Sequence, residues 1–113
     1  MLALPTFVAN AEEDSWFFEA TKTKITGRLY RWDGPADEAN ASTNNNSSNN
    51  IKVWVKIYAT DNGTTLDGSV RTNTGYPSAW VKSAARKPSW WGSIHTTTPT
   101  PDPYRTLNLY VGG

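Results

Sequence analysis

His95 is the single histidine of the chain, and Ser93 precedes it by two residues. Residues two apart on an extended strand share a face, so the serine hydroxyl and the imidazole would be neighbours there. A serine beside an imidazole is the centre of a hydrolytic triad, which an acid from another strand would complete. The segment lacks a nucleophile-elbow pattern and a Gly-rich oxyanion loop, so a surface or edge histidine among threonines is the simpler interpretation. A small hydrolase using His95 remains an alternative.

Carboxylate pairs offer a second chemistry, that of glycoside hydrolysis, at Asp33 with Asp37 and at Asp61 with Asp67. All four acids lie in turn-like sequence, where carboxylates usually cap the chain and face water. The chain contains no Cys, which excludes a thiol nucleophile, a thiolate metal site and a disulfide framework. The sequence therefore predicts no catalytic residue, no metal site and no cofactor.

Residues 51–60, IKVWVKIYAT, form the clearest strand in the sequence. Alternation along a pleated strand would place Val53, Val55 and Ile57 in the interior and turn Trp54 to solvent. The solvent side of this strand is basic and aromatic. This basic and aromatic pattern also has a purely structural interpretation. Cross-strand aromatic pairs and lysine stems stabilise a sheet by roughly 0.2 to 1 kcal/mol each without any ligand.

A second strand, residues 24–32, repeats this alternation of cations and rings. Amphipathic rings beside cations are typical of wet binding surfaces, which contact sugars, a membrane interface or a protein. If the two strands are neighbours in one sheet, they form one continuous face that Tyr110 can join. The predicted ligand-binding residues are Arg28, Tyr30, Trp32, Lys52, Trp54, Lys56 and Tyr58.

The remaining segments predict an all-β fold. Asp61-Asn62-Gly63 is the strongest hairpin signal, because Asn and Gly tolerate a positive φ. Trp90 and Trp91 are adjacent, so one indole should enter the core and the other should face outward. About seven short strands predict a small antiparallel β-sandwich, with a small β-barrel as the alternative. Besides the two strands above, the expected segments are 15–21, 64–72, 78–86 (with a short helix as its alternative), 89–98 and 104–111.

Two polar or proline-rich stretches separate these strands. Residues 36–50, ADEANASTNNNSSNN, have almost nothing to bury, and we expect a disordered, mobile loop there. Residues 98–103, TPTPDP, should be an extended spacer between sheets. Sequons that a eukaryotic secretory route could glycosylate begin at Asn40, Asn45, Asn46 and Asn62.

The N-terminal segment predicts export. Residues 1–11, MLALPTFVANA, are largely apolar, end in a small-x-small triplet and are followed by three acids. This pattern indicates the remnant of a secretory signal, with a single β-sandwich domain over 12–113; an N-terminal strand is the alternative. No other stretch is apolar for long enough to cross a bilayer. We therefore expect a secreted or cell-surface protein.

Charge and one resemblance complete the functional expectation. Eleven basic and ten acidic residues give a net charge of +1, which argues against a nucleic-acid partner. Residues 75–85, GYPSAWVKSAA, with a Tyr-containing final strand, resemble the small exported β-sandwich bacteriocins of the lactococcin type; the match covers under a third of the chain. That resemblance implies an antibacterial toxin acting at the cell envelope and assigns no site residue. The residues themselves predict a small secreted protein that binds a carbohydrate, cell-envelope or protein ligand.

Overall fold

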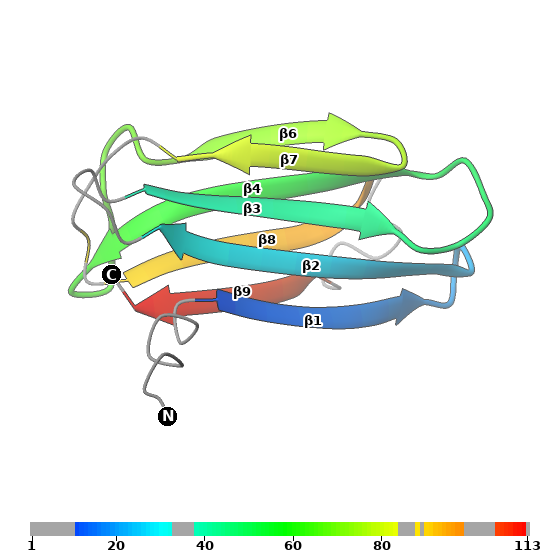
Figure 1. Ribbon diagram of the computed structural model, residues 1–113, viewed down its shortest axis with the longest axis horizontal. Helices are drawn as coiled ribbons and strands as arrows, with labels where there is room; N and C mark the ends of the chain where they lie inside the picture. Colours follow the sequence, from blue (N-terminus) through cyan, green and yellow to red (C-terminus); the bar gives the residue numbers. More distant parts are fainter. Residues whose placement is uncertain (1–10, 33–37, 84–87, 89, 99–105, 113) are drawn as a thin grey trace, which may run out of the picture.

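Two antiparallel β-sheets pack face to face in the computed structural model, which describes residues 11–32, 38–83, 88, 90–98 and 106–112 (Figure 1). The strands are β1 Ala11–Phe18, β2 Thr23–Trp32, β3 Glu38–Asn45, β4 Lys52–Asp61, β5 Thr64–Thr65, β6 Arg71–Gly75, β7 Ser78–Lys82, β8 Trp90–Thr98 and β9 Leu107–Gly112. The first sheet has the order β1-β2-β3-β7. The second has the order β5-β4-β8-β9, and β6 also pairs with β4. The predicted antiparallel β-sandwich is confirmed.

The core lies between the two sheets and is built by the alternation expected for β4. Val53, Val55 and Ile57 are fully buried, whereas Trp54 on the other side of the strand is only partly buried. Leu107 and its neighbours on β9 alternate in the same way. Of the adjacent tryptophans of β8, Trp91 is sealed in the core and Trp90 faces outward, as predicted. The burial patterns of β4 and β9 therefore follow from period-two patterning, whereas β8 is buried on both sides over most of its length.

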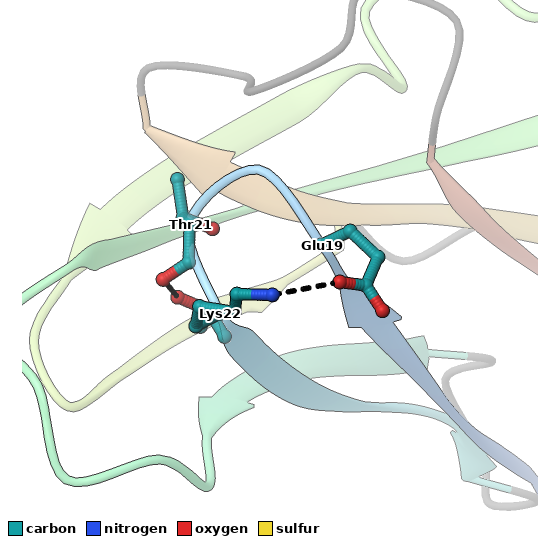
Figure 2. A network of polar contacts seen from close by, with 4 residues as sticks. Glu19, Thr21 and Lys22 are labelled. Atoms are coloured by element: carbon teal, nitrogen blue, oxygen red, sulfur yellow. Dashed lines mark hydrogen bonds and ion pairs between the residues drawn. The ribbon is translucent and has the colours of Figure 1, made fainter.

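Two turns fix the register of the hairpins that they connect. Asn62 and Gly63 both have positive φ, 50° and 80°, so the predicted tight turn between β4 and β5 is confirmed. The β1–β2 turn runs through residues 19–22, with Lys22 at a φ of 53°. Figure 2 shows the Lys22 ammonium donating to the Glu19 carboxylate, at 2.9 Å across this turn. The strand predicted at 15–21 is thus displaced toward the N-terminus, and its last three residues lie in the turn.

The most substantial correction concerns the polar tract 36–50. Residues 38–45 are not a disordered loop: they form β3, an inner strand of the first sheet, paired with both β2 and β7. Ala39, Ala41 and Thr43 point inward and are buried. Their small side chains leave room for the larger residues of the opposite sheet. The loop after β3 is held by Asn45, whose amide donates to the Ile51 carbonyl at 2.9 Å. A polar composition thus concealed a core strand.

The segments before and after the crossover between the two sheets differ in detail from the prediction. The segment predicted at 64–72 divides into β5 and β6, and the chain then crosses to the first sheet through the cis peptide bond Tyr76-Pro77. β6 and β7 lie together at one edge of the sandwich, and β1 and β9 lie at the opposite edge (Figure 1). Residues 78–82 are strand rather than helix. The predicted signal remnant, apart from Ala11, and the spacer after Thr98 lie outside the described residues.

Candidate functional site

The seven residues predicted to bind ligand do not share one face. Arg28 and Tyr30 lie on β2 in the first sheet, whereas the four predicted residues of β4 lie in the second sheet. Because the inner faces of the two sheets pack together, outward side chains of β2 and β4 point in opposite directions. The condition for one continuous face, that the two strands are neighbours in one sheet, is therefore not met. The side chain of Trp32 lies outside the part of the chain that the structure describes.

On the outer face of the first sheet, two of the three outward cations of the described strands are paired with acids from neighbouring strands. Arg28 Nε lies 2.9 Å from Glu13 Oε1, between β2 and β1. Lys82 Nζ lies 3.3 Å from Glu38 Oε1, between β7 and the start of β3. The members of each pair neutralise one another, so the outward charge that remains on the described strands of this face is that of Lys24.

The outer face of the second sheet has a different chemistry. The register places aromatic, lysine, hydroxyl and amide side chains on it, and none of its described strand residues that point outward is Asp or Glu. Lys52 and Lys56 have no ion-pair partner among the described residues, in contrast to Arg28 and Lys82. We call this surface the aromatic–lysine face; it comprises Lys52, Trp54, Lys56, Tyr58, Thr72, Thr74, Trp90, Ile94, Asn108 and Tyr110.

Three aromatic rings cluster at one end of this face, around Gly92. The Trp90 ring meets the Tyr110 ring edge-on, with centroids 5.1 Å apart and planes at 81°. It meets the Tyr58 ring in the same manner at 6.3 Å. Gly92 is the strand partner of both tyrosines, and a β-carbon there would lie 2.4 Å from Tyr58 Cζ. The glycine therefore leaves the space in which the Tyr58 ring lies over β8 and reaches toward β9.

The environment of Tyr58 keeps its hydroxyl protonated. Burial, with the neighbouring Tyr110 charge and hydrogen bond, raises the pKa of Tyr58 to about 12. The Lys56 ammonium lies 5.9 Å from the centroid of the Tyr58 ring, which is within the range of a cation–π contact. The cluster thus combines a neutral phenol with an adjacent positive charge.

An open pocket lies beside the same rings. It has a volume of about 530 Å³ and is lined by Trp90, Tyr110, Val111 and Gly112. Tyr110 is 49% exposed, so its ring is accessible to a ligand. Tyr110 was expected to join the face, but the sequence did not identify the part played by Trp90 and Gly92. The available signal was the WWG triplet, in which a glycine directly after two bulky residues marks a close approach on a strand.

His95 forms a second polar constellation, inside the core. Ser93 Oγ lies 2.7 Å from Nε2, and Thr43 Oγ1 lies 2.8 Å from Nδ1. The Thr43 hydroxyl donates to the Trp54 carbonyl at 3.0 Å, so the ring donates through Nδ1–H to Thr43 and accepts the Ser93 hydroxyl at Nε2. Burial lowers the pKa of His95 to about 4, although the Ser42 backbone favours the protonated ring. The imidazole is therefore neutral near pH 7.

This arrangement does not support the hydrolase alternative. Ser93 and His95 are neighbours as the sequence predicted, but both are fully buried, and the interpretation of His95 as a surface or edge residue is wrong. The third member of the network is the Thr43 hydroxyl from the opposite sheet rather than a carboxylate. A substrate has no access to a hydroxyl sealed between two sheets, so the network serves to connect them.

The remaining candidate groups are the acidic residues that the sequence offered as carboxylate pairs. Asp61 and Asp67 are exposed residues on either side of β5, and Asp33 and Asp37 lie outside the described residues. Within the described ranges, no group of three or more His, Asp or Glu side chains is placed to hold a metal ion. No helix in the same ranges is long and apolar enough to span a membrane.

Comparisons of the chain with protein-family models, with curated proteins and with solved structures found no match. The resemblance of residues 75–85 to exported bacteriocins gains no support from them. Fold and surface together define a small β-sandwich whose outer faces differ in the pairing of their cations and both expose aromatic rings, Tyr30 and Trp80 on the first sheet and Tyr110 on the second.

Proposed function

We propose that this protein is a small carbohydrate-binding β-sandwich that holds its ligand on the aromatic–lysine face. The observation that carries the proposal is the open pocket lined by Trp90 and Tyr110, beside the ring of Tyr58. Exposed aromatic rings offer flat, amphipathic surfaces, and a few polar groups around them fix the orientation of a ligand. A sugar ring presents matching chemistry, with an apolar face for stacking and hydroxyl groups at its rim.

The polar surroundings of the rings favour a carbohydrate over a protein partner. The centres of protein interfaces are depleted in Lys, yet Lys56 lies next to the aromatic cluster. Asn108 lies next to Tyr110 along β9, and Thr72 and Thr74 lie farther along the same face on β6, across β4, so the face carries short hydroxyl and amide groups. Such groups can exchange hydrogen bonds with sugar hydroxyls.

An extracellular location agrees with this proposal, because polysaccharides are accessible in the medium and at the cell surface. The argument for export rests on the sequence of residues 1–14 alone. No contact in the described part of the chain favours the toxin alternative over simple binding.

Binding to an immobilised panel of neutral and acidic polysaccharides tests the proposal. Trp90→Ala and Tyr110→Ala should each weaken retention at least about tenfold, because buried or central aromatic contacts dominate binding energies. Trp80→Ala is the matched control: this indole is 53% exposed on β7, on the outer face of the first sheet. Thermal unfolding shows whether each variant is folded, and Tyr110 is exposed enough for its replacement to be tolerated. Equal loss in the Trp80 variant, or no retention of the wild type by any polysaccharide, would contradict the proposal.

A further inference from the structure

We infer that the ligand of the aromatic–lysine face is an anionic polysaccharide, whose acidic groups lie along β4. The inference rests on the proposed function and deepens it. It is carried by the charge distribution over the two outer faces rather than by the aromatic pocket.

The outer faces of the two sheets differ in how many of their cations have an acidic partner. On the first sheet, Arg28 is paired with Glu13 and Lys82 with Glu38, which leaves Lys24 as the one outward cation of its described strands without an ion pair. On the second sheet, Lys52 and Lys56 lie on a face whose described strand residues include no outward acid. Both ammonium groups are therefore available to a counter-charge from outside the chain. An anionic ligand would supply it.

The spacing of the lysines favours a polymer over a small anion. Lys52 and Lys56 are four residues apart on the same side of β4, which places their α-carbons roughly 13 Å apart. Trp54 lies between them, and Tyr58 continues the line toward the pocket at Trp90 and Tyr110. A linear polyanion fits this separation better than a single carboxylate, since Coulomb attraction near water is weak beyond contact distance. A linear chain with repeated acidic groups can contact both lysines while its sugar rings lie on the aromatic residues.

Single-stranded nucleic acid is the other polyanion that stacks on aromatic sheet faces. Such binding relies on a groove or stripe with a clear excess of positive charge. Here the whole chain has a net charge of +1, and the face presents two lysines. The chemistry of the face therefore favours an acidic polysaccharide, and nucleic acid becomes a competing outcome in the test.

The test compares polymers that share a backbone and differ in charge. Polygalacturonate is paired with its methyl ester, dextran sulfate is paired with dextran, and oligothymidylate is the nucleic-acid probe. The wild type should bind an acidic member at least about tenfold more tightly than its neutral counterpart, and more weakly as NaCl rises to about 0.5 M. Binding of either acidic polymer supports the inference, and the one that binds identifies the acidic group as carboxylate or sulfate.

Lysine variants assign the effect to this face. Lys52→Gln combined with Lys56→Gln should weaken binding to the acidic polymer about fivefold or more, in line with partly exposed ion pairs. Lys24→Gln, on the exposed side of β2 in the first sheet, should leave it unchanged. Equal binding of neutral and acidic polymers, with loss only in Trp90→Ala, would overturn the anionic assignment and keep the carbohydrate proposal. Tighter binding of oligothymidylate would overturn the polysaccharide assignment, and failure of every probe would contradict both.

Discussion

Gly27 of β2 lies directly across the sandwich from the ring of His95: a β-carbon at Gly27 would lie 2.6 Å from His95 Cγ. The ring has little freedom to move, because it is buried and is hydrogen-bonded to Thr43 and Ser93 on its two sides. Gly27→Ala should therefore overpack the core and lower the free energy of unfolding by about 1 to 3 kcal/mol. Chemical denaturation of both proteins measures the difference.

A double-mutant cycle tests whether that cost comes from the imidazole. In a His95→Ala background the ring is absent, so Gly27→Ala should cost much less than it does in the wild type. Equal costs in the two backgrounds would show that the Gly27 position is sensitive for another reason.

The Thr43 hydroxyl links β3 to both β4 and β8. It donates to the Trp54 carbonyl and accepts from His95 Nδ1–H. Thr43→Val keeps the shape of the side chain and removes both bonds, so it should destabilise the fold by about 1 to 3 kcal/mol through unsatisfied buried groups. Thr43→Ser retains the hydroxyl and should recover much of that loss. Similar melting temperatures for the two variants would contradict this role.

Acid should destabilise the fold through His95. The folded pKa of about 4 lies below the ordinary value of 6.5, so between these pH values the unfolded chain binds a proton that the folded chain does not. Stability is fully present above about pH 6.5 and decreases as the pH falls toward 4, by up to about 3 kcal/mol. His95→Gln should lack this contribution, so the wild-type-minus-variant difference in unfolding free energy should shrink between about pH 7 and pH 5. A constant difference would contradict a buried neutral imidazole.

Gly92 controls the position of Tyr58 on the outer face. Gly92→Ala should displace the phenol from β8, since the new methyl group would occupy its place. The ring lies at the surface and can rotate away, so we expect a loss of stability of about 1 kcal/mol or less and a larger loss of ligand binding. Ultraviolet titration gives an independent readout, because the pKa of Tyr58 should fall from about 12 toward the ordinary value near 10. Tyr58→Phe identifies its signal, and an unchanged titration in Gly92→Ala would contradict the proposed packing.

Period-two patterning was sufficient for β4 and β9, whose apolar residues alternate with polar or aromatic ones, but not for β8, whose inward residues after Trp91 are polar. Burial of Val55 and its neighbours could therefore be predicted from the sequence. The same reasoning failed for β3, because Ala39, Ala41 and Thr43 are too small and too weakly apolar to stand out within an Asn- and Ser-rich tract. Their burial depends on larger residues that the opposite sheet supplies.

The candidate site was only partly predictable for a different reason. Local sequence indicates which side of a strand a residue occupies, but it does not indicate which strands share a sheet. Arg28 and Trp54 have equivalent patterns and lie on opposite outer faces of the molecule. The approach of Tyr58 to Trp90 and Tyr110 depends on the register of three strands that are distant in sequence.

The central claim is that the pocket beside Trp90 and Tyr110 holds a carbohydrate. Its most direct test is to titrate the labelled protein with an oligosaccharide cut from the polysaccharide that binds most tightly, and to follow each amide and indole by NMR. The account predicts saturable shifts of the Trp90 indole and of amides of β4, β8 and β9, with the Trp80 indole unchanged. Shifts centred on Trp80 and β2, or no saturable shift in any residue, would contradict it.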